Sequence, residues 1–212
     1  IGHLCHPMPS ASDNASGSGA MLEMARALKR MVDTGAISRP RRTIRFLWVP
    51  EFAGTVPYIK AHLERVRRTL AVINCDMVGE HLAKTGGQFT ITQTPHSMPT
   101  VLNDVAVHVA GVVERLGLTS INGSTLPFAW RAAPYSGGSD HLDFNDGAVK
   151  VPALMFGHGD TFHHTSLDTM DKVDASELRR VAVVTLGTMV YLASAGDREA
   201  LDMARLVARN GL

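Results

Sequence analysis

Stretches of helical and strand periodicity alternate along this chain. Apolar residues recur at helical spacing from about Gly17 to Val32, which predicts a helix, and Gly35 is suited to end it. Short continuous apolar runs predict strands between the helices. The expected strands cover about 43–49, 70–75, 89–92 and 149–156, and the expected helices cover about 17–32, 56–66, 100–116, 174–195 and 198–209. Such alternation predicts an α/β fold in which helices cover a mostly parallel sheet.

Local patterns add detail to several of these segments. Asp174 and Glu177 have the spacing of a capping box at the start of a helix. The polar stretch 80–87 is typical of a loop. Helical spacing also predicts inward-facing side chains, which are Val56, Ile59, Leu63 and Val66 in one helix and Leu201, Ala204 and Leu206 in the last.

Two carboxylates directly follow expected strands. Glu51 lies two residues after the strand at 43–49, and Asp76 lies one residue after the strand at 70–75. Ligands of open α/β sheets gather at the carboxyl ends of the strands, so both side chains are expected at one edge. Taken alone, an aspartate at the position of Asp76 is more often a turn cap than a functional residue.

Further polar residues lie near the N-terminus. Asp13 opens a segment rich in glycine and serine, residues 13–19, where an isolated aspartate is read as an ordinary N-cap. His3 and His6 are three residues apart in a proline-bounded loop, so the two-histidine grip of a zincin helix does not apply. A metal site needs at most one of these two histidines.

A turn rich in histidine and aspartate, residues 162–174, contains His163 and His164 outside any apolar periodic run. Imidazoles and carboxylates are the ligands of hydrolytic zinc sites, so the turn and the residues above predict a metallohydrolase. A serine hydrolase is disfavoured, because Ser139, Asp140 and His141 are consecutive and cannot form a relay. The chain also lacks the GxSxG elbow of many such enzymes.

Composition limits the alternatives. A chain of 212 residues with 45% hydrophobic content can bury one core, so one domain is expected over residues 1–212. The formal net charge of +1 gives no field that would attract nucleic acid or an anionic membrane. No apolar run approaches the roughly 18 residues of a membrane span. Cys5 and Cys75 are too few for a disulfide framework, although folding could bring them together.

The first residues, Ile1-Gly2, resemble the tail of a strand whose earlier part is missing. We therefore expect residues 1–212 to be the C-terminal part of a longer polypeptide. The sequence leaves localisation unknown, with the cytoplasm slightly favoured, and it leaves the oligomeric state open.

Five blocks of residues together resemble the zinc-dependent aminopeptidases, a family that includes bacterial leucine aminopeptidases, glutamate carboxypeptidase II and glutaminyl cyclase. They occur in the family's order and span the chain. The pattern is most similar to an aminopeptidase-like branch with Pro-Glu in place of the usual Glu-Glu and often an extra upstream domain. The blocks are His3-Leu4-Cys5-His6-Pro7, Ser12-Asp13-Asn14-Ala15-Ser16-Gly17, Pro50-Glu51 with Gly54-Thr55, Asn74-Cys75-Asp76-Met77-Val78-Gly79, and Gly138-Ser139-Asp140-His141 with His164-Thr165 and Asp168-Thr169.

The resemblance implies a three-layer αβα sandwich and two zinc ions per chain. The implied ligands are one histidine of the first block, a bridging Asp13, Glu51, Asp76 and His164. Alignment of the first strand favours His3, whereas related sequences of this branch keep the Cys-His-Pro histidine, which is His6. His163 is then expected to be a partly exposed neighbour, and His158 is a weaker candidate.

The main departure from the family is Pro50, where members generally have a general-base glutamate. Glu51 therefore either binds zinc while another group takes the proton, or acts as the base in a site with fewer protein ligands. Asp140 and His141 are expected to support the ligands or face the substrate.

Together, these features predict a zinc aminopeptidase that hydrolyses N-terminal residues from peptides through a metal-activated bridging water. The alternatives are a glutaminyl-cyclase-like ring closure or a carboxypeptidase activity on the same scaffold. A metal-binding interaction domain without catalysis, suggested by Pro50, is a further alternative. Side-chain preference is open.

Overall fold

The computed structural model describes residues 1–6, 9–118 and 127–210, and Pro7 of the first block lies outside them. A four-stranded sheet forms the centre, with strand order β3-β6-β4-β5. β3 pairs with β6 in parallel, β6 with β4 antiparallel, and β4 with β5 in parallel. The prediction of a mostly parallel sheet is therefore confirmed. The strands are β3 (Val72–Cys75), β4 (Phe89–Thr92), β5 (Trp130–Ala133) and β6 (Ala153–Gly157).

A second pair of strands, β1 (Gly2–His3) and β2 (Trp48–Val49), runs parallel beside this sheet. Hydrogen bonds from Ile1 N to Ile73 O (2.9 Å) and from Cys75 N to Ile1 O (2.8 Å) join the start of β1 to β3. β1 therefore lies between β2 and β3. As a result, His3 at the end of β1 and Asp76 just after β3 come to the same edge.

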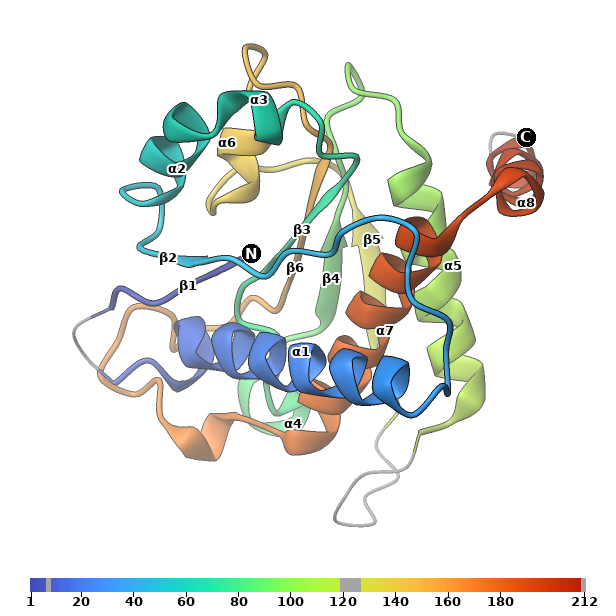
Figure 1. Ribbon diagram of the computed structural model, residues 1–212. Coiled ribbons are helices and arrows are strands. Elements are labelled where there is room, and N and C mark those ends of the chain that lie inside the picture. Colours follow the sequence, from blue (N-terminus) through green and yellow to red (C-terminus); the bar gives the residue numbers. More distant parts are fainter. Residues whose placement is uncertain (7–8, 119–126, 211–212) are drawn as a thin grey trace.

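Helices cover both faces of the sheet, which confirms the αβα layers (Figure 1). On one face, α1 (Gly17–Asp33), α5 (Val101–Leu116) and α7 (Ala175–Ser194) enclose the larger apolar core. On the other, α2 (Thr55–Ala61), α3 (Leu63–Val66) and α6 (His141–Asn145) enclose a smaller one. The remaining helices are η1 (Ala11–Ser16), α4 (Leu82–Thr85), η2 (Met170–Lys172) and α8 (Asp197–Asn210).

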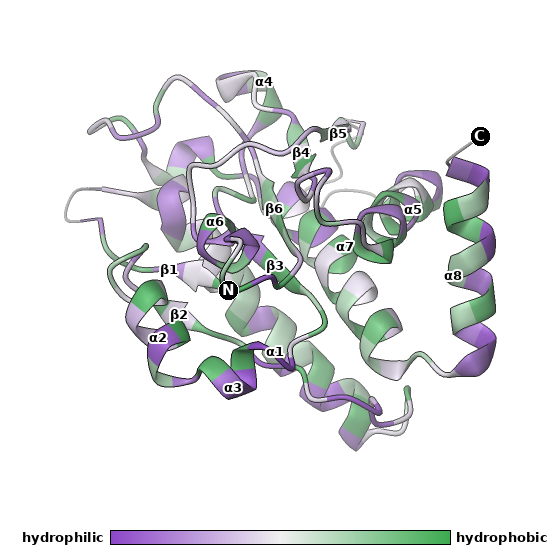
Figure 2. Cartoon of the chain, turned by 90° about the horizontal axis from the view of Figure 1, so that it is seen from above, coloured by the Kyte–Doolittle hydropathy of each residue, from purple (hydrophilic) through white to green (hydrophobic). Residues whose placement is uncertain are grey.

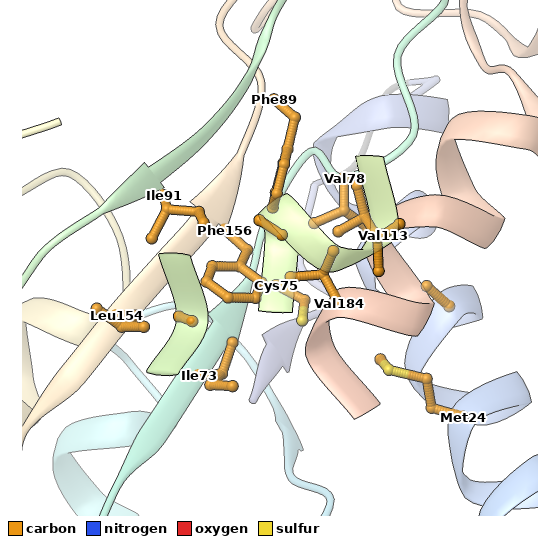
Figure 3. Close-up of a cluster of buried hydrophobic side chains, with 14 of the residues drawn as sticks. Met24, Ile73, Cys75, Val78, Phe89, Ile91, Val113, Leu154, Phe156 and Val184 are labelled. Atoms are coloured by element: carbon orange, nitrogen blue, oxygen red, sulfur yellow. The ribbon is translucent and has the colours of Figure 1, made fainter. Parts of the chain in front are cut away.

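The larger core is built around aromatic side chains of the central strands (Figure 3). Phe89 of β4 and Phe156 of β6 are both fully buried, with ring centroids 5.4 Å apart in an edge-to-face arrangement. Phe89 also stacks on Phe128 at 5.6 Å. Aromatic pairs of this kind add stability beyond the area they bury. Val184 of α7 and Met24 of α1 close the same cluster from the helical layer.

Three predicted segments differ from the structure. The strand expected at 43–49 is only Trp48–Val49. An apolar cleft of about 560 Å³ separates residues 43–47 from β3, so in the described structure these residues do not pair with a strand. The helix expected at 56–66 is broken at His62 into α2 and α3, and Val56 points outward with 51% of its surface exposed. The loop expected at 80–87 contains the short helix α4. The strand β5 was not predicted.

The C-terminal segments bring two further corrections. α7 begins as expected, and Asp174 accepts a hydrogen bond from Ser176 N (2.7 Å), but Glu177 pairs with Arg180 at 2.5 Å instead of completing a capping box. α8 forms, yet none of its side chains is buried. Leu201, which was expected inward, is 62% exposed, because α8 lies against α5 at the edge of the molecule (Figures 1 and 2).

The cysteines do not pair: Cys5 is exposed and Cys75 is buried, and both are free. Their possible approach is therefore not realised. None of the helices in the described ranges combines the length and hydropathy that crossing a membrane requires.

Replacing Phe156 by alanine should lower the free energy of unfolding by about 3–5 kcal/mol, because the substitution opens a cavity at the centre of the larger core. Leu201→Ala is the matched control on the exposed side of α8, and it should change stability by no more than about 0.5 kcal/mol. Urea denaturation of both variants measures the difference. An equal loss for Leu201→Ala would contradict the exposed position of α8.

Candidate metal centre

The first part of the site is assembled by three elements that are distant in sequence. Asn14 fixes their relative position: its Nδ2 donates to Cys75 O at the end of β3 (2.9 Å), and its Oδ1 accepts from Gly17 N at the start of α1 (2.9 Å). Gly17 allows this close approach, since a Cβ there would collide with the Cys75 carbonyl. The clamp holds Asp13, next to Asn14, against Asp76, next to Cys75.

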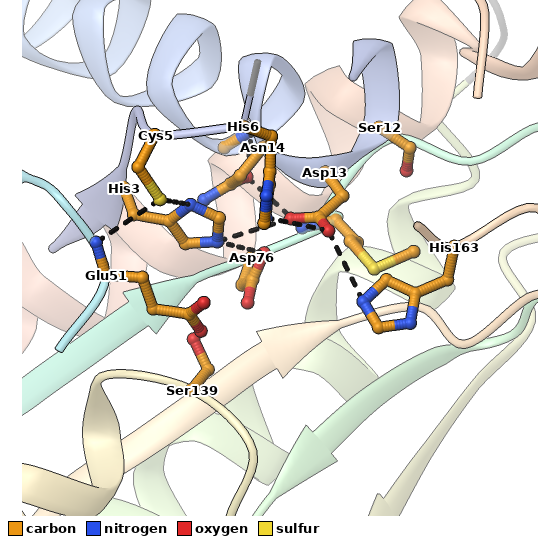
Figure 4. A network of polar contacts seen from close by, with 12 residues as sticks. His3, Cys5, His6, Ser12, Asp13, Asn14, Glu51, Asp76, Ser139 and His163 are labelled. Atoms are coloured by element: carbon orange, nitrogen blue, oxygen red, sulfur yellow. Dashed lines mark hydrogen bonds and ion pairs between the residues drawn. The ribbon is translucent and has the colours of Figure 1, made fainter. Parts of the chain in front are cut away.

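Asp13 is the centre of the cluster, and its side chain is only 4% exposed (Figure 4). It is not a helix cap, because α1 begins four residues later and its N-cap is Ser16. Asp13 Oδ1 lies 3.3 Å from His3 Nε2, and the same nitrogen lies 3.2 Å from Asp76 Oδ1. These three buried residues form one group whose ligand atoms lie within 4.8 Å of one another.

The second oxygen of Asp13 faces a different group of histidines. Asp13 Oδ2 lies 3.1 Å from His6 Nε2 and 3.1 Å from His164 Nε2, and these residues form a second set of three potential ligands. His163 Nε2 is 3.3 Å from the same oxygen, with its ring against that of His164 at 3.7 Å. The side chains of His163 and His164 are 47% and 59% exposed, so this group is open to solvent.

The spacing of these atoms fits ligands of a shared cation. With zinc bonds of about 2.0–2.1 Å in tetrahedral geometry, two ligand atoms on one ion lie about 3.3 Å apart. A charge-assisted N–H···O hydrogen bond is shorter, at about 2.7–2.9 Å. The observed nitrogen–oxygen distances around Asp13 are 3.1–3.3 Å. Moreover, among the described residues, the buried atoms His6 Nε2 and Asp13 Oδ2 have no hydrogen-bond partner.

The electrostatics of the cluster also favour positive charge. Burial lowers the pKa of His3, but its hydrogen bonds to Asp13 and Asp76 outweigh burial and raise that pKa to about 11. Burial raises the pKa of Asp13, and the bond with His3 and the nearby His6 overcome this and lower it. The buried carboxylates thus hold a positive partner, which a divalent cation can replace.

Glu51 lies beside both groups but belongs to neither (Figure 4). Burial is the main cause that raises the pKa of its carboxyl group, and a side-chain hydrogen bond with Ser139 opposes the shift. Ser139 is itself fully buried and accepts a hydrogen bond from Asn74 Nδ2 of β3 at 2.7 Å. Glu51 instead forms a third set of potential ligands with His3, Cys5 and His6.

Cys5 is a residue of the site that the sequence did not single out, although it adjoins His6. Its Sγ lies 3.5 Å from Nδ1 of His3, the ring nitrogen that faces away from Asp13 and Asp76. Glu51 N donates to the same sulfur at 3.4 Å. Cys5 therefore connects the His3 ring to the main chain of Glu51.

Asp140 and His141 are fully buried behind the site. Asp140 Oδ1 accepts from Phe52 N (2.8 Å) and Thr55 Oγ1 (2.7 Å), which holds the turn that follows Glu51. His141 Nε2 contacts Ser136 O at 2.7 Å. Burial lowers the pKa of His141. Asp140 therefore holds the segment that carries Glu51.

Two further buried carboxylates support the site. Asp168 accepts from Ser12 N (2.8 Å) and Asp13 N (2.9 Å) through its two oxygens, so it fixes the main chain of Asp13. Glu80 accepts from Ser12 Oγ at 3.1 Å, and burial followed by the charge of Asp160 raises its pKa to about 8. Asp168 stood in a sequence block without an assigned role. Glu80 directly follows another block. The sequence did not indicate its role, because Ser12 and Asp160 are far from Glu80 along the chain.

Two other regions lie outside the cluster. His158, the weaker candidate, is buried in the core beside Phe89, and its Nδ1 contacts Met77 O at 2.9 Å. Two clefts formed by described residues, of about 560 and 690 Å³, contain none of the candidate ligands. The chemistry is therefore concentrated where the loops meet the carboxyl ends of β1 and β3.

The sequence and the fold are similar to those of known aminopeptidases. The sequence is 25% identical over 182 residues to the aminopeptidase YwaD of Bacillus subtilis (strain 168), a match that covers 81% of this chain and 35% of YwaD. The structure resembles the aminopeptidase LapA of Legionella pneumophila, with a TM-score of 0.67, 21% identity and coverage of 93% of this chain and 51% of LapA.

It also resembles BSAP, a zinc aminopeptidase from Bacillus subtilis, with a TM-score of 0.65, 19% identity and coverage of 92% of this chain and 45% of that chain. The chain thus spans about a third to a half of the length of these relatives. The family model of peptidase family M28 matches residues 2–189. This match includes every candidate ligand, and the chain belongs to peptidase family M28.

Proposed function

We propose that this protein is a zinc-dependent aminopeptidase that removes N-terminal residues from peptides. The observation that carries the proposal is the position of Asp13, whose two oxygens face two separate groups of histidine and carboxylate ligands. A carboxylate in that position suits two ions that share it. Membership of a peptidase family and the aminopeptidase relatives support the same activity.

The residues that would hold the ions are His3, His6, Asp13, Asp76 and His164, with Glu51 beside them. Zinc ions bound there would lower the pKa of a shared water and stabilise the oxyanion of the peptide carbonyl. Asp168 and Asn14 hold the main chain on both sides of Asp13. The negative charge of the site's carboxylates would attract the free amine of a substrate, which favours an exopeptidase.

The full-length protein should release free amino acids from a panel of aminoacyl-anilides. A chelator should abolish the release, and added zinc should restore it, because the water needs the metal to be activated. Ammonia release from peptides with N-terminal glutamine would instead indicate ring closure, and release of C-terminal residues would indicate a carboxypeptidase. Absence of all three activities in zinc-loaded protein would leave a non-catalytic metal-binding domain.

Replacing Asp168 by asparagine should weaken zinc binding by about 10- to 100-fold, since the amide NH₂ cannot accept the second main-chain N–H and the support of a ligand is lost. Asp171→Asn is the matched control, because Asp171 is exposed and its partners Thr169, Lys172 and Lys84 are not candidate ligands. Competition with a chromophoric chelator measures both affinities. Equal affinities would contradict the role of Asp168.

Removal of the Cys5 sulfur should also weaken zinc binding, because the ring N–H opposite a metal-bound nitrogen needs an acceptor that fixes the ring. Cys5→Ala should lose about 10-fold in affinity at His3. Cys5→Ser keeps an acceptor oxygen and should recover part of the loss. If alanine and serine variants bind zinc as tightly as the unaltered protein, Cys5 does not position His3.

A further inference from the structure

The two N-terminal histidines are not alternatives for one position in this structure. His3 Nε2 faces Asp13 Oδ1 and Asp76, whereas His6 Nε2 faces the other oxygen of Asp13. Their rings lie nearly perpendicular, at 85°, with centroids 5.1 Å apart. If His3 and Asp76 bind one ion, His6 Nε2 still faces the other oxygen of Asp13, Oδ2.

The atoms around that oxygen already make up a set of three ligands. His6 Nε2 and His164 Nε2 each lie 3.1 Å from Asp13 Oδ2, and their rings are 5.0 Å apart. His6 Nε2 has no hydrogen-bond partner within the described ranges. Three protein ligands and an open position are typical of a catalytic zinc site.

Glu51 is not part of this second set, although it shares another set of potential ligands with His6. Its carboxylate lies beside Ser139 (Figure 4), and Ser139 accepts a hydrogen bond from Asn74 of β3. The main chain beyond Glu51 is held by Asp140. In the described part of the chain, the groups of potential ligands that contain Glu51 include neither Asp13 nor His164.

We propose that His6, and not Glu51, completes the second metal site with Asp13 and His164, and that Glu51 is the general base. The ligand assignment stands on the geometry alone, and the base assignment rests on the proposed function. The arrangement explains how the chain functions with Pro50: a histidine supplies the ligand, which leaves the one glutamate free for proton transfer.

In this role Glu51 takes a proton from water while the water oxygen forms its bond to the peptide carbonyl carbon. The proton then passes to the amine nitrogen as the C–N bond breaks, so the glutamate is ionised again after each cycle. Ser139, which lies beside the carboxylate, orients it. No further reactant is needed.

The test compares His6→Ala and Glu51→Gln in the full-length protein by elemental mass spectrometry after dialysis against zinc. The unaltered protein should hold about two zinc ions per chain, His6→Ala about one, and Glu51→Gln about two. Glu51→Gln should nevertheless lose about 10²- to 10⁴-fold in kcat, as expected for removal of a general base. His6→Glu, which returns a ligand atom of similar reach, should recover the second ion.

His96→Ala is the control for loss of a histidine, because His96 is exposed on the loop after β4 and far from the candidate ligands in sequence and contacts. It should keep both ions and full turnover. Circular dichroism of each variant checks that metal loss is not loss of fold, and the His6 side chain is partly exposed on a loop.

The reverse pattern, in which Glu51→Gln loses an ion while His6→Ala keeps both, would overturn the proposal. Retention of both ions by both variants would overturn the ligand assignment as well. These results depend only on metal content. If the unaltered protein binds two ions without releasing amino acids, the aminopeptidase proposal and the base role of Glu51 fail, while the ligand assignment of His6 is still decided.

Discussion

The burial of the Asp13 carboxylate is the constraint on which the rest of the site depends. A buried charge without a partner is very costly, and this side chain is only 4% exposed. Histidines lie next to both oxygens of Asp13, and a buried carboxylate, Asp168, accepts a hydrogen bond from the main chain of Asp13. The protein must therefore keep positive charge beside the Asp13 carboxylate, either as protonated histidines or as bound divalent cations.

The two halves of the cluster differ in burial, because strand ends carry one half and loops carry the other. His3 and Asp76 lie at the ends of neighbouring strands, and Asn14 ties the start of α1 to the same place. These residues are buried and fixed by main-chain geometry. His6 and His164 are on loops and are more exposed, so this half of the cluster is the one open to solvent.

The smaller core on the opposite face of the sheet has its own part in the site. Asp140, next to α6, binds the turn after Glu51, and Ser139 meets the Glu51 carboxylate. Glu51 is thus positioned by the layer of α2 and α6, whereas Asp13 is positioned by the layer of α1. The two layers meet at the sheet edge, which brings Glu51 next to the ligand set around Asp13.

The sequence by itself determined the fold class, the parallel character of the sheet and the set of candidate ligands. Helical and apolar periods are local properties, and residues that follow strands end at one edge of a sheet by geometry alone. It did not predict the truncated strand at 43–49 or the exposed side of α8, since both depend on which neighbours are available for pairing and packing. Only the tertiary structure decided that His3 and His6 face different oxygens of Asp13, and that Glu51 is turned toward Ser139. The physical reason is that side-chain direction around a shared carboxylate is set by contacts between segments as far apart as residues 3, 76 and 164, and no local pattern of residues contains that information.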